Sequence, residues 1–306
     1  MDRARFPALR DHLLHLAMRA SGGALNRESI GLALIGYDRS LRLSGAGPVA
    51  SFETCAHRGD APVYPASLAK LFCLYVFAAF EALGRFSPDD EDRRAARAMI
   101  EVSSNEAMAF LIGRLTGAFD GPCLEEEELQ AWITRRQGLQ DWLMALGRPE
   151  FMPVHVLHAT YSDSPYGCAS QARRRSSGNL LTPVACARLM EDIVRGSAPS
   201  SAWMLDLLDR TQQRRILMAT GRPVEGDQVM GFLGEKLPST TRVWSKCGHT
   251  SRTRHDLVYA ETAEGPSFIL CVMTEGLWSS LDTALLPQMG RLIHRFFSDP
   301  TEAPTP

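Results

Sequence analysis

The spacing of hydrophobic residues changes several times along the chain, and each change predicts a different element. Near the amino terminus, apolar residues recur at helical spacing and predict an amphipathic helix. These residues are Leu9, Leu13, Leu16 and Ala17. The stretch SIGLALIGYDRSLRLSG (29–45) then predicts an antiparallel hairpin of two short strands with a turn at Tyr37, Asp38 and Arg39.

The middle of the chain is dominated by helical patterns. Residues 67–115 carry helical periodicity, and the acidic run 125–128 is typical of the start of another helix. Residues 148–181 show little periodicity and many turn-forming residues, so they predict a long loop. Thr182 followed by Pro183 predicts the capped start of a further helix.

Three β patterns and a final helix close the chain. The strands are RVWSKCG (242–248), DLVYAET (256–262) and SFILCVMTEG (267–276), and the helix spans about 281–297. Strands from both ends of the chain can share one sheet. The predicted fold is therefore α+β, an α/β sandwich: a five-stranded antiparallel sheet flanked by the terminal helices, with an all-helical lobe. The sheet subdomain would comprise 1–60 and 215–306, and the helical subdomain 61–214, in a single intertwined two-lobed domain.

Composition narrows the function to small-molecule chemistry. The 306 residues include 33 Lys plus Arg and 35 Asp plus Glu, so a net charge of -2 gives no electrostatic argument for a nucleic-acid or membrane partner. The seven cysteines contain no C-x-x-C pair, which favours reduced thiols over a disulfide framework or a zinc site. No stretch is typical of a signal peptide or a membrane span, so the chain as written is expected in the cytoplasm, or exported if a leader was removed.

One short stretch, PASLAKLF, places Ser67 three residues before Lys70. Residues three apart lie on one face of a helix, so the lysine amine can reach the serine hydroxyl. A lysine partly desolvated in a cleft can have a pKa low enough to remove the serine proton and create a nucleophile. Taken alone, the pattern favours a capping serine beside a surface lysine over a nucleophile, because chance matches to S-x-x-K are common. Pro65 predicts an extended backbone before the serine.

Two further motifs change this interpretation. Ser103-Ser104-Asn105 stands at the predicted start of a helix, and Lys246-Cys247-Gly248 stands near the end of a predicted strand. With S-x-x-K, these motifs occur in the order described for penicillin-interacting serine enzymes. The chain resembles the superfamily of class A serine β-lactamases and penicillin-binding proteins, and NLLTPVACARLMEDI is similar to the helix that follows its omega loop.

The resemblance implies a role for each motif residue. Ser67 would be the acylated nucleophile, and Lys70 would be its base or proton relay. Ser103 would pass a proton toward the leaving nitrogen, while Asn105 would hold the lysine or the substrate amide. Lys246 would strengthen the positive field near a substrate carboxylate.

The resemblance also implies the binding groups of the cleft. The oxyanion hole would consist of the backbone amides of Ser67 and of His249, which follows Gly248. Arg254, or Arg252 beside it, would bind the substrate carboxylate next to the Lys246 strand. The family needs no metal or organic cofactor.

The chain departs from the family where the acyl group would be released. Residues 148–181 contain no E-x-x-L-N motif, and Ser104 and Cys247 replace the family's aspartate and threonine. Tyr161, Asp163 and Tyr166, in TYSDSPYG, are the candidate replacement cleft residues, with a structural turn as the alternative. The cluster Arg173, Arg174 and Arg175 suits a carboxylate site or a solvated loop.

Two other patterns leave alternatives open. Cys247 beside Lys246 suits a reactive thiol or a packed strand cysteine. His255 and Asp256 suggest a catalytic pair, but adjacent residues of a strand point to opposite faces, which argues against it.

The predicted function is a soluble serine hydrolase that forms an acyl-Ser67 intermediate on an amide, ester or β-lactam carbonyl. The substrate would be a small molecule that carries a carboxylate. The alternatives are an acyltransferase or a glutaminase-type amidase on the same fold, and a non-catalytic penicillin-binding-like module that senses a ligand.

Overall fold

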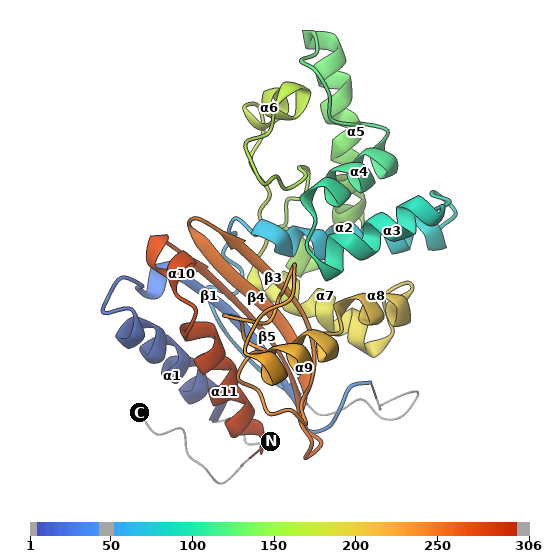
Figure 1. Cartoon of the computed structure of the whole chain (residues 1–306). Coiled ribbons are helices and arrows are strands. Elements are labelled where there is room, and N and C mark those ends of the chain that lie inside the picture. Colours follow the sequence, from blue (N-terminus) through green and yellow to red (C-terminus); the bar gives the residue numbers. More distant parts are fainter. Residues whose placement is uncertain (1–4, 43–51, 299–306) are drawn as a thin grey trace.

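The computed structural model describes residues 5–42 and 52–298, and its centre is one antiparallel sheet of five strands (Figure 1). The strands are β1 (Ile30–Tyr37), β2 (Phe52–His57), β3 (Arg242–Thr250), β4 (Thr253–Glu261) and β5 (Ser267–Glu275). Their order across the sheet is β2-β1-β5-β4-β3, so strands from the two ends of the chain meet at the β1–β5 pair. The predicted α+β fold is confirmed.

The predicted first hairpin needs a correction. β1 ends at Tyr37, and its partner is β2, which begins only at Phe52. Residues 40–42 form no strand, and residues 43–45 lie outside the described part of the chain. The true second strand, FETCAH, alternates between exposed and half-buried positions, and this weak pattern at the edge of the sheet conceals it.

One face of the sheet is covered by the terminal helices α1 (Arg5–Ala20) and α11 (Leu285–Ser298), which lie side by side in Figure 1. Leu32 and Leu34 of β1 point into this layer and pack with the apolar stripes of both helices. Ala33 and Ile35 point to the opposite face. The period of two in β1 thus divides the protein into two apolar cores.

The other face supports the helical lobe. Its central helix, α2 (Ala69–Ala82), is buried along most of its length, as expected for a helix that is apolar on all sides. α7 (Pro183–Arg195) packs on β1 and β5, and Thr182 caps it as predicted. The remaining helices are α3 (Asp90–Glu101), α4 (Asn105–Thr116), α5 (Glu126–Ala145), α6 (Gly167–Arg173), α8 (Ser201–Leu208), α9 (Thr211–Thr220) and α10 (Leu277–Leu281).

The segment 148–181 is more structured than its sequence predicts. It contains the short helix η3 (Pro149–Phe151) and α6, and bridges at His155↔Leu180 and Val63↔Leu181 fasten it to the body. The second bridge fixes the chain shortly before Ser67. The boundaries predicted for the two subdomains stay a prediction.

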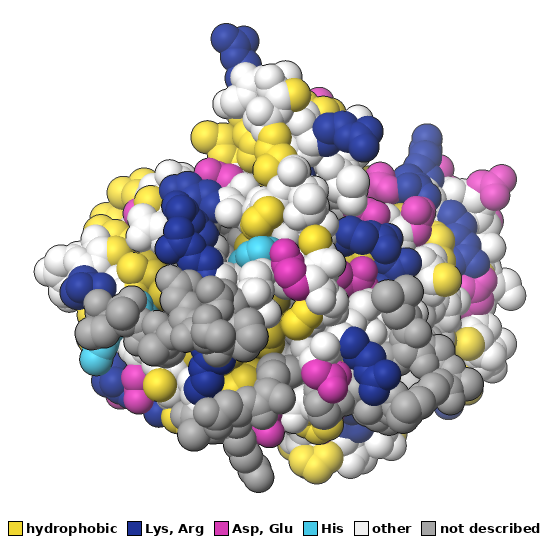
Figure 2. Space-filling view, turned by 90° about the horizontal axis from the view of Figure 1, so that it is seen from below, with side chains coloured by type: hydrophobic (Ala, Val, Ile, Leu, Met, Phe, Trp, Pro, Cys, Tyr) yellow, Lys and Arg dark blue, Asp and Glu magenta, His cyan; other side chains and the backbone are white. Residues whose placement is uncertain are grey.

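Surface charge and helix composition are relevant to the prediction that the chain has no nucleic-acid or membrane partner. The face shown in Figure 2 carries both basic and acidic side chains, as the small net charge suggests. Within the described ranges, none of the helices is both long and apolar enough to cross a membrane.

Candidate active site

Ser67 lies in a tight turn at the start of α2. The turn is the short helix η2 (Ala66–Leu68), closed by a hydrogen bond from the Leu68 amide to the Pro65 carbonyl (3.1 Å). Ala66 has a φ of 48°, in the left-handed region that is costly for a residue with a Cβ. The backbone before Ser67 is therefore not extended as predicted, but sharply turned. This turn presents a half-buried hydroxyl at the helix amino terminus.

Lys70 is 0% exposed, one turn after Ser67 on α2. Its Nζ lies 2.9 Å from Ser67 Oγ, 2.7 Å from Asn105 Oδ1 and 3.2 Å from Ser103 Oγ. It also donates to the Ser103 carbonyl (2.5 Å). All four acceptors are neutral oxygens, so the amine is buried and has no ion-pair partner within residues 5–42 and 52–298.

Ser103 and Asn105 come from the junction of α3 and α4. Ser103 has a φ of 59°, and this turn directs both its carbonyl and its hydroxyl toward Lys70. Ser104, which stands where the family has an aspartate, caps α4 by accepting a hydrogen bond from the Ala107 amide (3.1 Å). The substitution therefore leaves the helix cap intact.

Lys246 enters the cluster from the sheet. It lies on β3, is 0% exposed, and donates to Ser103 Oγ at 2.9 Å. It also donates to the Cys247 carbonyl (3.0 Å) and to Gln228 Oε1. Ser103 Oγ thus connects the two lysines.

Burial and charge lower the pKa of both amines. Desolvation, reinforced by the charge of Lys246, lowers the pKa of Lys70 to about 7, although Glu106 acts in the opposite direction. Desolvation lowers the pKa of Lys246 to about 8. A lysine with a pKa near 7 has a substantial neutral fraction at neutral pH and can accept a proton.

Gly248 allows β3 to approach the nucleophile. A Cβ at this position would lie 2.9 Å from the Pro65 carbonyl oxygen and 3.2 Å from the Ser67 amide nitrogen. Only glycine permits this contact without displacing the turn. His249, the proposed second donor of an oxyanion hole, is the next residue on the same strand, and its Nε2 lies 2.9 Å from the Ser280 carbonyl.

The predicted cleft residues of TYSDSPYG lie elsewhere. Tyr161 donates its hydroxyl to Asp120 (2.5 Å) inside the helical lobe, and burial together with Asp120 raises its pKa. Asp163 is exposed, and none of the described contacts joins it to Lys70 or Asn105. The structure does not bring either residue into the cluster.

The alternate residues of this stretch reach the site instead. Thr160 donates to Asn105 Oδ1 (2.7 Å), and Asn105 Nδ2 donates to Ser162 Oγ (3.0 Å). The sequence thus indicated the correct stretch, but the side chains that contact Asn105 are those of Thr160 and Ser162 and not those of Tyr161 and Asp163. Gln228, which contacts Lys246, belongs to no motif and left no signal in the sequence.

The arginines proposed for carboxylate binding have protein partners. Arg254 donates to the carbonyls of Ser280 (3.1 Å) and Gly231 (3.4 Å), whereas Arg252 is exposed. In the loop cluster, Arg173 donates to the Ala159 carbonyl, Arg174 to Ser170 Oγ, and Arg175 pairs with Glu126.

The two remaining alternatives are resolved by packing. Cys247 is buried, and burial raises its pKa despite the opposing effect of Lys246, so it is a packed strand cysteine. His255 lies 2.9 Å from the Tyr64 carbonyl, whereas Asp256 accepts from the Leu233 amide at 2.9 Å. They form no catalytic pair.

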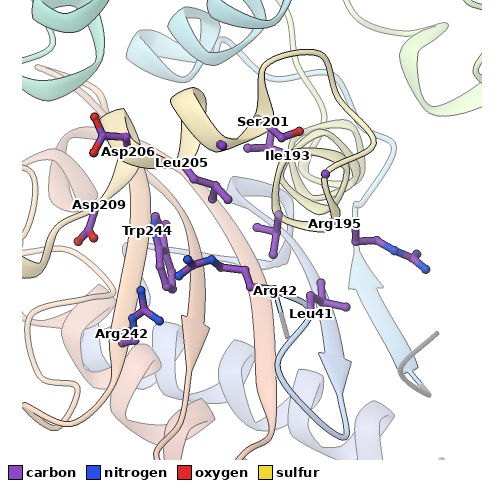
Figure 3. A pocket seen from close by; sticks show the side chains of 13 residues that line it. Leu41, Arg42, Ile193, Arg195, Ser201, Leu205, Asp206, Asp209, Arg242 and Trp244 are labelled. Atoms are coloured by element: carbon purple, nitrogen blue, oxygen red, sulfur yellow. The ribbon is translucent and has the colours of Figure 1, made fainter. Parts of the chain in front are cut away.

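A second hollow, of about 450 Å³, lies by the start of β3 (Figure 3). Arg42, Arg242 and Trp244 line it, together with residues of α7 and α8. Its serine, Ser201, donates to the Ala198 carbonyl (2.6 Å) and has no lysine beside it in the lining. Among the residues that line this hollow there is thus no counterpart of the contact between Lys70 and Ser67.

Comparisons with known proteins find one family model and a set of solved structures that are similar to this chain. A family model described as "Beta-lactamase enzyme family" matches residues 91–297, which excludes Ser67 and Lys70 but includes the other two motifs. No curated protein matches.

Solved structures extend the similarity over nearly the whole chain. A β-lactamase from Sphaerobacter thermophilus superposes with a TM-score of 0.61 at 16% identity, covering 97% of this chain and 98% of that one. One from Chitinophaga pinensis gives 0.60 at 13%, covering 94% and 99%. A mutant of PBP-A, solved as an acyl-enzyme complex with penicillin G, gives 0.61 at 17%, covering 95% and 97%. At these identities the likeness concerns the fold.

Proposed function

The chain belongs to the β-lactamase enzyme family, and from this premise we propose that it is a serine hydrolase that forms an acyl-Ser67 intermediate. The observation that carries the proposal is the contact between Lys70 Nζ and Ser67 Oγ (2.9 Å), made by an amine whose pKa is lowered to about 7. A base with a pKa near the working pH is suited to remove the serine proton.

The acylation step uses only residues of the cluster. Neutral Lys70 takes the hydroxyl proton, and Ser67 Oγ attacks the carbonyl carbon of an amide, ester or β-lactam. The oxyanion accepts hydrogen bonds from the backbone amides of Ser67 and His249. The carbonyl carbon then loses its bond to the leaving nitrogen or oxygen, which receives a proton from Ser103, and Ser103 is reprotonated by Lys70.

The position of Ser103 supports this proton route. Its hydroxyl lies 3.2 Å from Lys70 Nζ and 2.9 Å from Lys246 Nζ, so it can pass a proton while both neighbours stay in place. Lys246, protonated below its pKa of about 8, stabilises the negative charge that develops in the transition state.

A second candidate is acyl transfer to an amine. Among the described residues, the hydrogen-bond partners of Lys70 and Asn105 include no carboxylate that would activate water for deacylation. An acyl-enzyme without such a base survives long enough to meet a stronger nucleophile. Added hydroxylamine should then speed release of the acyl group, whereas an enzyme built for hydrolysis would show no acceleration.

The test of acyl-serine chemistry is labelling with a neutral fluorophosphonate, followed by intact mass and peptide mapping. We expect one adduct per chain, on Ser67, and none in Ser67→Ala. Ser104→Ala is the matched control, because Ser104 caps α4 and does not contact Lys70. An unlabelled wild-type chain, or equal labelling of Ser67→Ala, would refute the proposal and favour a non-catalytic module.

A further inference from the structure

Gln228 closes the β3 end of the site. It is 2% exposed, and its Nε2 donates to the carbonyls of Ile100 (2.6 Å) and Glu101 (2.8 Å) at the end of α3. Its Oε1 accepts from Lys246 Nζ. Both ends of the amide are therefore satisfied, and the side chain is held between the helical lobe and the sheet.

This contact completes the hydrogen bonding of Lys246. An ammonium group has three N–H donors. Here they have three acceptors: Ser103 Oγ, the Cys247 carbonyl and Gln228 Oε1. The thiol of Cys247 also lies within 3.6 Å of Gln228 Oε1. Gln228 Oε1 thus accepts the hydrogen bonds of Lys246 and Cys247 that an anionic substrate group would need at this place.

The neighbouring arginines do not replace Lys246 as an anion site. Arg210 is 1% exposed, and its guanidinium donates to the carbonyls of Ser245 (2.8 Å) and Ile100 (3.2 Å). Arg254 donates to backbone carbonyls and lies over the Phe232 ring at 5.0 Å. The guanidinium groups of Arg210 and Arg254 are therefore used to hold the protein together.

We propose that Gln228 determines substrate specificity by occupying the anion position beside Lys246, so that the enzyme prefers acyl donors that are uncharged at this end. The inference rests on the proposed acyl-Ser67 chemistry. The sequence led us to expect a substrate carboxylate beside Lys246, whereas we now infer a neutral ester or amide group of the substrate at this place.

The physical reason is desolvation. A carboxylate that enters this end of the site loses water and finds Lys246 already saturated, so it must either displace Gln228 or remain without a strong donor. Displacing Gln228 would leave its side-chain amide without partners and would remove one hydrogen bond from each of two carbonyls of α3, those of Ile100 and Glu101. A neutral ester loses far less hydration and avoids this cost.

The test compares one cephalosporin as its free acid and as its methyl ester. Second-order rate constants for acylation of Ser67 are measured by intact mass, and each is divided by the rate constant of the same compound with hydroxide. For the wild type, we expect the corrected rate constant of the ester to exceed that of the acid at least tenfold.

Two substitutions separate the role of Gln228 from folding. Gln228→Ala frees a donor of Lys246 and should lower the ester-to-acid ratio at least tenfold. Gln228→Glu places a negative charge there and should raise the ratio. Gln213→Ala is the control, because Gln213 Oε1 accepts a hydrogen bond from the backbone N–H of Gln228 (3.2 Å) and not from Lys246. This variant should keep the ratio of the wild type.

Two results would overturn the inference: a wild type that prefers the free acid, or a ratio that is the same in the wild type, Gln228→Ala and Gln228→Glu. Failure of the proposed function looks different. In that case Ser67 is acylated by neither cephalosporin and is not labelled by the fluorophosphonate.

Discussion

Two buried amines with different environments set the chemistry at the scale of single residues. Lys70 has only neutral acceptors, and the charge of Lys246 further lowers its pKa. The resemblance to penicillin-interacting serine enzymes implied that these two lysines and Ser103 would meet. It could not predict Gln228, because that contact depends on how a loop between α9 and β3 docks against the end of α3.

Replacing Lys246 by Gln removes the positive charge that disfavours protonation of Lys70. We expect the pKa of Lys70 to rise, so the increase of the acylation rate with pH should move above its wild-type position near pH 7. The rate of fluorophosphonate labelling as a function of pH measures this. Lys236→Gln, at an exposed position, is the control and should leave the midpoint unchanged. If the midpoint of the pH profile of Lys246→Gln lies at or below that of the wild type, the charge of Lys246 does not lower the pKa of Lys70.

Asp256 is a buried carboxyl with one oxygen that lacks a hydrogen-bond partner. Burial raises its pKa from 3.8 to about 7. Because the folded pKa exceeds the unfolded one, the unfolded state ionises first, and this group reduces stability as pH rises from about 4 to about 7. The loss amounts to about 4 kcal/mol above this range.

Asp256→Asn removes this titration. The free energy of unfolding of the variant, relative to the wild type, should therefore increase between pH 4 and pH 7, as measured by urea denaturation at each pH. A difference between the two proteins that stays constant over this range would show that folding does not raise the pKa of Asp256.

At the scale of elements, the site depends on the close approach of β3 to η2. Gly248→Ala would place a Cβ against the Pro65 carbonyl and the Ser67 amide, both of which are backbone groups that cannot rotate away. We expect acylation to slow by about 100-fold or more, because the nucleophile and its oxyanion donors move relative to each other.

Gly138→Ala is the matched control, since its Cβ meets nothing within 4 Å in the middle of α5. It should leave the acylation rate unchanged and stabilise the fold by about 0.5–1 kcal/mol. Equal rates for Gly248→Ala and the wild type would mean that the packing of β3 on η2 does not position the nucleophile.

Most elements could be predicted because their patterns are strong. β5 is an apolar run, β4 contains the apolar stretch LVYA, and β3, β4 and β5 are buried along nearly their whole length. α2 is apolar except for Lys70 and Glu81. β2 was missed because an edge strand needs little apolar surface, and α6 because seven residues are too few to reveal a period. In the extended stretch 160–163, contacts with Asn105 rather than residue type decide which side chains face the site.

At the scale of the whole molecule, three distant segments assemble the site. Ser67 lies at the start of α2, Ser103 comes from the helical lobe, and Lys246 comes from the sheet. The fold therefore brings together the residues that we propose for acylation, whereas the segment 148–181 contains no E-x-x-L-N motif for release of the acyl group.

The presence of a base for acylation and the lack of one for deacylation in the described part of the chain predict that product is released in two phases. With p-nitrophenyl acetate in excess, we expect a burst of about one nitrophenolate per chain, followed by slower release, because acylation has a base and deacylation has none among the described contacts. Quenched samples should contain acetylated Ser67. Linear product formation with unmodified protein at steady state would show instead that deacylation is fast.

The most direct test of the account is the pH dependence of Ser67 acylation by a neutral fluorophosphonate, followed by intact mass. If Lys70 is the base, the rate rises as pH increases through about 7 and then levels off, and Lys70→Met shows a slow rate without this step. A rate that rises only near pH 10, where an ordinary lysine loses its proton, or a Lys70→Met variant as fast as the wild type, would contradict the account.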